Sequence, residues 1–368
     1  MANSRLHELS KRGVSVWFDT LSRDLVQTGE LKRMMDEDAV VGVTSNPTIF
    51  QKALSTGEAY DEDMKKCLEA TDDPTEIFFS LALQDIRAAC DVLKPAYDAS
   101  NGVDGYVSME VLPSLAYDAE ATFDQVQRIS KEVDRPNLYV KIPATAPGLP
   151  AIEDSIAHGT PINITLIFSL ERYKAVVEAY IRGLERLVAG GGDPAKVASV
   201  ASFFVSRVDT EADKRLEALG NKELQGKLAI ANAKLAYQHY LDVFSGPRWE
   251  FLESKGATKQ RCLWASTSTK NPAYRDVMYV EELIGPETVN TMPLETIEAF
   301  QDHGEVRGNT VFEGLDEAKR LFEQLAEAGV DYDDVTDTLE AEGVQKFADS
   351  FDEIVESIRA KRGALAAA

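Results

Sequence analysis

The sequence is poor in the residues that build disulfide frameworks and most metal sites. Its 368 residues include only three cysteines and four histidines. The cysteines form no Cys-x-x-Cys pair, and such sparse use is typical of a reducing compartment rather than of a disulfide-linked or zinc-binding domain. No His-Glu-x-x-His pattern occurs, and the histidines lie outside the expected strands. We therefore expect no metal site.

Positive charge and long apolar runs are also scarce. The chain has 62 acidic and 39 basic residues, and its formal net charge is −23. Nucleic acids and anionic membranes attract clustered basic surface, so neither is an expected partner. No apolar run reaches the length of about 18 residues that a membrane span needs, and the polar segment 1–12 contains no signal-peptide core. We expect a soluble cytoplasmic enzyme.

Glycine-rich nucleotide loops are missing as well. The first expected strand leads into Asp-Thr-Leu-Ser instead of a glycine-rich turn, which argues against a dinucleotide-binding fold. The Gly-Gly-Gly-Asp-Pro run at 190–194 is not followed by Gly-Lys-Ser/Thr, so it is a helix stop and not a phosphate loop.

Eight strand-like runs alternate with helical segments along the chain. The expected strands lie within residues 13–20, 39–44, 104–112, 138–142, 161–168, 197–206, 260–266 and 287–293. Parallel strands need helical crossovers of this kind, and eight such units are typical of a (β/α)8 TIM barrel, an α/β fold. A doubly wound open sheet is the alternative.

We expect one barrel domain over residues 1–368. A helical insert at about 48–93 is expected to cover part of the barrel, and Thr71–Glu76 within it carries a helix-start signature. The acidic stretch 331–337 looks faintly like a calcium loop but lacks glycine at its sixth position, so a solvated loop is expected there. C-terminal helices follow at about 338–360.

One lysine interrupts a short apolar run. Lys141 lies within 138–142, just before Pro143. Buried parallel strands are apolar on both faces, and an amine in such a strand loses hydration, which favours its neutral form. A neutral amine attacks carbonyl carbons, as in Schiff-base catalysis. The alternative is that Lys141 marks the strand end and extends its head into water.

Polar residues occupy the expected carboxyl ends of the strands, where the active sites of such barrels lie. They are Asp19, Asn46, Glu110, Lys141, Asn163, Thr165, Ser202, Arg207, Ser266 and Lys270. The set combines one inner amine, two carboxylates, several neutral hydrogen-bonding groups and two outer cations. Asn163 and Thr165 are two residues apart, so their side chains point to the same face.

Several of these residues also have a purely structural interpretation. Asp19 could be a helix N-cap, and Asn46 could be a turn residue. Glu110 could pair with a neighbouring cation of the barrel, and Arg207 could form a salt bridge with Asp209. The neutral residues of the fifth strand could simply satisfy hydrogen bonds in the core.

Six motifs give the chain a family resemblance. In order they are Asp19-Thr, Thr44-Ser-Asn-Pro-Thr, Ser108-Met-Glu-Val, Val140-Lys-Ile-Pro-Ala-Thr, Ile162-Asn-Ile-Thr-Leu-Ile-Phe-Ser and Ser202-Phe-Phe-Val-Ser-Arg. With them the chain resembles the transaldolases from about residue 13 to 359. The resemblance implies a class I aldolase-type barrel. It also implies transfer of a dihydroxyacetone unit from sedoheptulose 7-phosphate or fructose 6-phosphate to erythrose 4-phosphate or glyceraldehyde 3-phosphate, in the non-oxidative pentose phosphate pathway.

The resemblance also implies catalytic roles. Lys141 would form an iminium ion with the C2 carbonyl, and this cation would be the electron sink for cleavage of the C3–C4 bond without a metal or other cofactor. Asp19 would take and return the proton of the C4 hydroxyl. Glu110 and Thr165 would hold and polarise the water of iminium formation and hydrolysis. Two carboxylates in different environments can take such separate roles.

Substrate contacts are implied for residues beside this set. Asn46, Asn163 and Ser202 would bind hydroxyls of the dihydroxyacetone part. Arg207 would grip the phosphate, because a planar guanidinium can make bidentate contacts. Phe204 belongs to the same binding set.

The sequence departs from the family pattern after the seventh strand. The family often has Ser followed closely by Arg there, as a second phosphate contact, whereas this chain has Ser266-Thr-Ser-Thr-Lys270. We expect Lys270 to substitute as a point charge, and Ser266 to bind substrate.

Two rival functions differ in class. A fructose 6-phosphate aldolase of the same superfamily would release free dihydroxyacetone, but those enzymes are much shorter and usually carry Gln at the position of Glu110 and Tyr at that of Phe204. A non-catalytic barrel that binds sugar phosphates is the other rival, and the presence of Lys141 and Asp19 argues against it. The sequence leaves a monomer and a homodimer both open.

Overall fold

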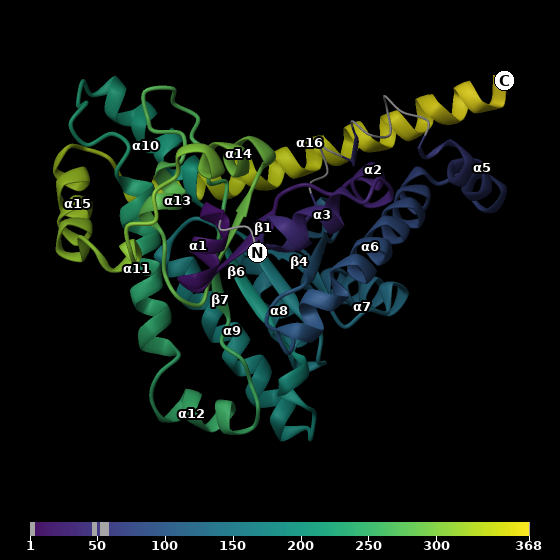
Figure 1. The fold of residues 1–368 in the computed structure, drawn as a ribbon, viewed down its shortest axis with the longest axis horizontal. Coiled ribbons are helices and arrows are strands. Elements are labelled where there is room, and N and C mark those ends of the chain that lie inside the picture. The colour runs from purple at the N-terminus through teal and green to yellow at the C-terminus, as the bar shows by residue number, and fades with distance from the viewer. Residues whose placement is uncertain (1–3, 46–49, 52–58, 368) are drawn as a thin grey trace.

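The structure, a computed structural model, describes residues 4–45, 50–51 and 59–367, without the side chains of 364–367. Eight parallel strands close into a barrel in which each strand pairs with the next and the last pairs with the first (Figure 1). The strands are β1 (Val14–Phe18), β2 (Val40–Thr44), β3 (Tyr106–Glu110), β4 (Leu138–Pro143), β5 (Ile162–Ile167), β6 (Ser199–Phe204), β7 (Arg261–Ala265) and β8 (Thr288–Met292). The predicted TIM barrel is confirmed.

Helices surround the barrel. They are α1 (Arg5–Lys11), α2 (Arg23–Gln27), α3 (Glu30–Glu37), α5 (Asp61–Ala70), α6 (Pro74–Ala99), α7 (Ala119–Val133), α8 (Leu149–Ala157), α9 (Leu170–Ala189), α10 (Val205–Ala218), α11 (Leu228–Val243), α12 (Pro247–Ser254), α13 (Met278–Glu282), α14 (Leu294–His303), α15 (Leu315–Glu327) and α16 (Tyr332–Ala367). Short 3-10 turns are η1 (Pro113–Leu115), η2 (Ala146–Gly148), η3 (Pro194–Lys196) and η4 (Thr310–Phe312). No described helix combines the length and the apolar character that a membrane crossing needs.

Local sequence signals set where the helices begin. Asp73 caps α6 by accepting from the backbone N–H of Thr75, and Pro74 occupies the first turn, as the helix-start signature predicted. Ser169 caps α9 in the same way by accepting from the N–H of Arg172. These caps satisfy backbone donors that the first helical turn leaves without partners.

The C-terminal region differs from the expectation. The acidic stretch 331–337 is not a loop, because α16 starts at Tyr332 and continues to Ala367. The Asp331 carboxylate accepts from the N–H groups of Asp333 and Asp334, and acidic groups in a first turn interact favourably with the helix dipole. The start of the helical insert expected at about 48–93 lies mostly outside the described residues, and the remainder forms α5 and α6.

A polar cluster lies at the amino-terminal end of the barrel. The Arg261 guanidinium donates to Ser15 Oγ at 2.7 Å and to Asp104 Oδ1 at 3.1 Å. Ser15 Oγ donates in turn to Asp104 Oδ2 at 3.0 Å. Beside it, the rings of Tyr106 and Tyr139 stack with centroids 4.0 Å apart. These contacts join β1 and β7 to the segment before β3, and Ser15, Asp104, Tyr139 and Arg261 also line a cavity of about 540 Å³ at this end.

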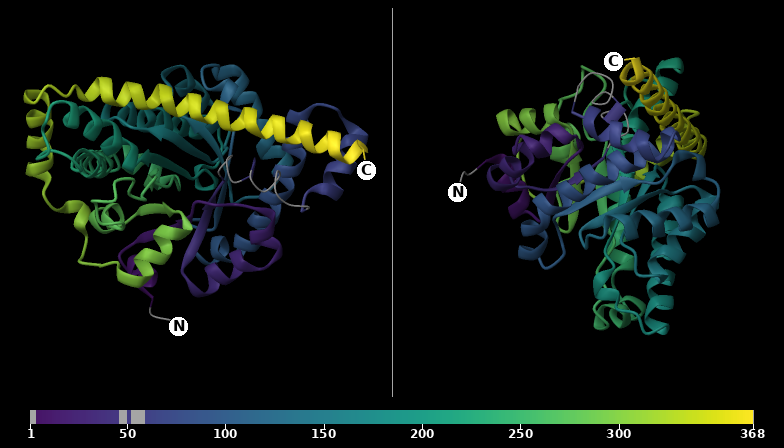
Figure 2. Two further views of the ribbon diagram at one scale, coloured as in Figure 1. Left: turned by 90° about the horizontal axis from the view of Figure 1, so that it is seen from above. Right: turned by 90° about the vertical axis from the view of Figure 1, so that its right-hand side faces the viewer.

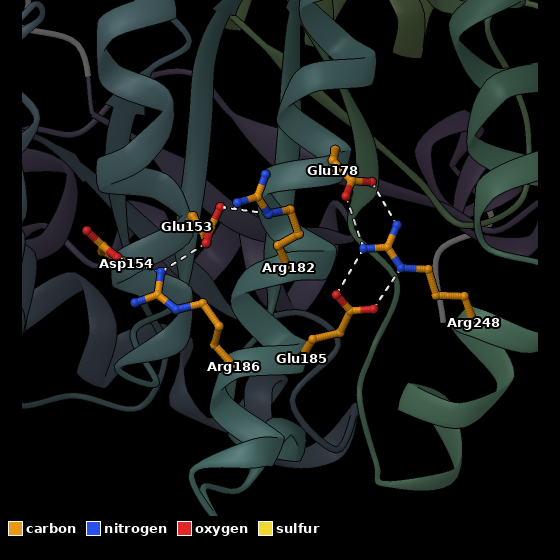
Figure 3. A network of polar contacts seen from close by, with 7 residues as sticks. All are labelled: Glu153, Asp154, Glu178, Arg182, Glu185, Arg186 and Arg248. Atoms are coloured by element: carbon orange, nitrogen blue, oxygen red, sulfur yellow. Dashed lines mark hydrogen bonds and ion pairs between the residues drawn. The ribbon is translucent and has the colours of Figure 1, made fainter.

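An ion-pair network ties three outer helices together (Figure 3). Arg248 of α12 binds Glu178 and Glu185 of α9 at 2.8 and 2.7 Å. Arg182 and Arg186 of α9 bind α8 through a second set of pairs, and the whole network consists of Glu153, Asp154, Glu178, Arg182, Glu185, Arg186 and Arg248. Exposed pairs of this kind are individually weak, at about 1 kcal/mol or less, so each adds little to the packing of these helices.

Helix α16 lies across the barrel instead of continuing the outer ring (Figure 2). It packs on α10, β5 and α6. Gly343 allows a close approach, since a Cβ there would lie 2.9 Å from Cδ2 of Leu166 in β5. Further along, the rings of Phe351 and Phe78 meet edge to face with centroids 5.4 Å apart. These contacts bring α16 to the carboxyl ends of the strands.

A close contact between β1 and β2 predicts a stability effect at Gly42. A Cβ at this position in β2 would overlap the indole ring of Trp17, which is fully buried in β1. We expect Gly42→Ala to lower the free energy of unfolding by roughly 1–3 kcal/mol, because overpacking forces neighbouring groups out of place.

Urea denaturation followed by tryptophan fluorescence would measure this change. Gly363→Ala is the matched control, since a Cβ there meets nothing within 4 Å in α16. Equal stability of the two variants would contradict the packing described for Gly42.

Candidate active site

A cavity of about 300 Å³ opens at the carboxyl ends of the strands. We call it the mouth cavity. All eight strands contribute to its wall or are followed by a residue that does, and its polar lining from the barrel is Asp19, Thr44, Ser45, Glu110, Lys141, Asn163, Thr165, Ser202, Arg207, Ser266 and Thr291. Phe204 lies on the same wall, and α16 adds Lys346, Phe347 and Ser350. Most of the polar residues singled out in the sequence therefore meet in one place.

Lys141 lies inside the barrel and is only 7% exposed. Its Nζ is 3.1 Å from Oε2 of Glu110 and donates to the backbone carbonyl of Ser45 at 3.4 Å. The parallel register places Lys141 directly between Glu110 on β3 and Asn163 on β5. Lys141 therefore does not extend into water but points into the mouth cavity beside a carboxylate.

Glu110 links this lysine to a hydroxyl. Its Oε1 accepts from Thr165 Oγ1 at 3.1 Å, while Oε2 faces Lys141. The expected alternative, a pair with a barrel cation, is thus present, and that cation is Lys141 itself. One carboxylate between an amine and a hydroxyl can move a proton at either group.

Asp19 follows β1 and is held by the neighbouring strands. Its N–H donates to the carbonyl of Met292, and its Oδ1 accepts from Thr44 Oγ1 at 2.7 Å. It is not a helix N-cap, since Ser22 caps α2. Burial raises the pKa of the Asp19 carboxyl, while the hydrogen bond from Thr44 and the charge of Lys141 oppose that rise. A raised pKa brings a carboxyl closer to the range in which it can exchange protons near neutral pH.

A chain of neutral groups crosses the inner face of the cavity. Ser202 Oγ donates to Asn163 Oδ1 at 2.6 Å, and Asn163 Nδ2 donates to Ser108 Oγ at 3.1 Å. All three side chains are buried, with at most 3% exposure. Because its oxygen and nitrogen are both engaged, the Asn163 amide is fixed in orientation.

Arg207 stands at the outer wall, in the first turn of α10. Its guanidinium carbon lies 4.9 Å from the centroid of the Phe204 ring. Among the described residues its buried Nη1 has no hydrogen-bond partner. The expected alternative is wrong, because Asp209 instead accepts from the N–H of Ala229 and the hydroxyl of Tyr279. A half-buried guanidinium whose Nη1 is a spare donor is suited to an anionic ligand.

Two predicted site residues that follow β7 line different cavities. Ser266 lines the mouth cavity in a left-handed conformation, φ +53°, and its carbonyl accepts from the N–H of Ser206. Lys270 lines a different cavity, beside Asp213, and its Nζ donates to Ser268 Oγ at 2.8 Å. The structure does not bring Lys270 to Lys141, and the predicted substrate contact Asn46 lies outside the described residues.

Sequence reasoning missed the contribution of α16. Lys346, Phe347 and Ser350 line the mouth cavity although the chain reaches them long after the last strand. With Gly343 they have the spacing i, i+3, i+4 and i+7, which defines one helix face. This face is not an apolar stripe, so periodicity alone gave no signal that it packs against the barrel.

Comparison with known proteins agrees with this geometry. The profile of the Transaldolase/Fructose-6-phosphate aldolase family matches residues 16–358. The chain belongs to this family. It is 51% identical to the transaldolase of Frankia alni over 97% of both chains, and 50% identical to that of Mycolicibacterium paratuberculosis over 98% of both. "Transaldolase 2" of Streptomyces avermitilis is 49% identical, again over 98% of both chains. The family and these full-length relatives support a transaldolase, an enzyme that transfers a dihydroxyacetone unit.

The hydrogen bond from Thr44 predicts a pH effect. Donation to the carboxylate favours its charged form, so Thr44→Val should raise the pKa of Asp19 further. If Asp19 acts as a base, the acid limb of the pH profile of kcat/KM then moves to higher pH. Thr44→Ser keeps the hydroxyl and should leave the limb in place. An unmoved limb in Thr44→Val would contradict the role of Asp19.

Proposed function

We propose that this chain carries out the transaldolase reaction through a Schiff base on Lys141. The donor is sedoheptulose 7-phosphate or fructose 6-phosphate, and the acceptor is glyceraldehyde 3-phosphate or erythrose 4-phosphate. The observation that carries the proposal is the buried amine of Lys141, 3.1 Å from Glu110, in a cavity that Asp19 and Arg207 also line.

Iminium formation begins with a proton transfer. The Lys141 amine must lose a proton before it can attack, and Glu110 is in contact to accept it. The amine adds to the C2 carbonyl of the donor, and the resulting carbinolamine loses water to give the iminium ion. Thr165, hydrogen-bonded to Glu110, helps to hold this water as it leaves and when it returns.

Carbon–carbon cleavage uses the second carboxylate. Asp19 removes the proton of the C4 hydroxyl, the C3–C4 bond breaks, and its electron pair moves into the iminium to form an enamine. An aldose phosphate leaves. The acceptor aldehyde then binds, the enamine attacks its carbonyl carbon, and Asp19 returns the proton to the new hydroxyl. Hydrolysis of the iminium releases the ketose product and restores the amine.

The remaining polar residues orient the sugar. Ser202 and Asn163 offer fixed groups to the dihydroxyacetone hydroxyls, and Asn46 is proposed for the same part. Arg207, stacked on Phe204, binds the phosphate. Ser266 lies on the same wall and is proposed as a further substrate contact.

We also propose a cellular location and a domain organisation for the protein. The three cysteines are buried and free, which supports a reducing, cytoplasmic location. We also treat residues 1–368 as a single domain, since the strands form one closed barrel and α16 packs on it.

Trapping of the intermediate tests the role of Lys141. Borohydride treatment with fructose 6-phosphate should add a dihydroxyacetone-sized mass to the peptide that contains Lys141, because the reductant converts the iminium to a stable amine. Lys141→Met should show no adduct and lose transfer by about 1000-fold or more, as expected when a covalent nucleophile is removed. Lys234 is the internal control, since it is similarly buried but paired with Glu282 outside the mouth cavity.

The result also separates the proposal from its rivals. An absent adduct at saturating donor would favour a barrel that only binds sugar phosphates. A substantial rate of cleavage without any acceptor would favour the fructose 6-phosphate aldolase.

Substitution of Arg207 tests the phosphate site. Arg207→Ala should raise KM for phosphorylated donors by about 10- to 100-fold, because hydrogen bonds to charged groups contribute roughly 1.5–3 kcal/mol. Steady-state kinetics with fructose 6-phosphate and with unphosphorylated fructose would measure this. An equal loss with both sugars would contradict a phosphate role.

A further inference from the structure

Helix α16 supplies a charged part of the active-site wall. Gly343, Lys346, Phe347 and Ser350 share one face, and the last three line the mouth cavity. Leu166, against which Gly343 packs, has φ +56° at a register shift in β5. The irregular part of β5 thus packs against α16 at Gly343, within one helical turn of Lys346. This contact fixes the position of Lys346 at the mouth cavity.

We propose that Lys346 is the second cation that binds the substrate phosphate, together with Arg207, and that Glu342 holds it in place until the phosphate arrives. The proposal rests on the proposed function and deepens it. It assigns to α16 the contact for which the sequence had suggested Lys270.

The charges around Glu342 support this assignment. Lys346 Nζ lies 3.0 Å from Glu342 Oε2, one helical turn away. The pKa of Glu342 is lowered first by Lys346 and also by the charges of Lys214 and Arg207. Lys346 thus contacts Glu342 directly, and the charges of Lys214 and Arg207 act on the same carboxylate, in a chain whose net charge is −23. A phosphate dianion that displaces this carboxylate from Lys346 would enter the cavity that Arg207 also lines.

The position of Lys346 also fits that of Arg207. Both line the mouth cavity, and Glu342 lies close enough to Arg207 to influence its charge. Lys270 lines another cavity, beside Asp213. The side chain of Lys346 is 59% exposed, so its ammonium group stays hydrated in the absence of substrate. Its contact with a phosphate would therefore be screened by salt.

Inorganic phosphate provides a test that does not need turnover. Isothermal titration should show that Lys346→Ala weakens phosphate binding by about tenfold, the lower end for a charged hydrogen bond. Lys346→Arg should retain most of the affinity. Glu342→Gln should bind phosphate more tightly than the wild type, because the competing carboxylate is removed. If α16 had only a structural role, Lys346→Ala and Glu342→Gln would not change phosphate affinity in opposite directions.

Kinetics should agree with the titration. We expect Lys346→Ala to raise KM for fructose 6-phosphate about tenfold, with a smaller effect on kcat and on the use of fructose, and with a weaker dependence on ionic strength than the wild type. Lys319→Ala, an exposed lysine on α15, is the matched control and should match the wild type.

Specific outcomes would overturn the inference. They are unchanged phosphate affinity and KM in Lys346→Ala, an equal loss with phosphorylated and unphosphorylated sugars, or the expected losses in Lys270→Ala instead. Failure of the borohydride trap in the wild type would sink the Schiff-base function alone, since phosphate binding is measured without it.

Discussion

The candidate active site depends on holding a lysine amine inside a closed barrel. Lys141 is 7% exposed, and an unpaired charge at such a place would cost several kcal/mol. Glu110 compensates it at 3.1 Å, and Thr165 and the Ser45 carbonyl satisfy neighbouring polar groups. In the proposed mechanism the carboxylate that compensates the buried amine is also its proton acceptor, so one interaction would serve both stability and chemistry.

The rest of the fold keeps this pair in place. At the amino-terminal end, Arg261 of β7 binds Ser15 of β1 and Asp104, while the mouth cavity lies at the carboxyl ends of the strands. Hydrogen bonds hold the groups around the amine in fixed orientations. Asn163 donates to Ser108, and Asp19 accepts from Thr44. Preorganised groups of this kind need little rearrangement during reaction.

The strand-end rule explains how much of the site the sequence predicted. In a parallel barrel all carboxyl ends meet at one rim, so polar residues that follow apolar runs, such as Glu110 and Thr165, must converge. Their partners could not be predicted in the same way. Asp19 had an equally good local interpretation as a helix cap, but in the structure Ser22 caps α2. Arg207 had Asp209 two residues away as a possible partner, but in the structure Asp209 accepts from Tyr279.

The sequence by itself determined the barrel and placed Lys141 within an apolar strand, because apolar runs, crossovers and an isolated charge are local patterns. Only the tertiary structure decided which cations reach the mouth cavity. Lys270 was near the right strand end, but its loop turns it toward Asp213, whereas Lys346 arrives on a helix that follows the whole barrel. That placement depends on long-range packing of Gly343 on Leu166 and of Phe351 on Phe78, which no spacing along the chain encodes.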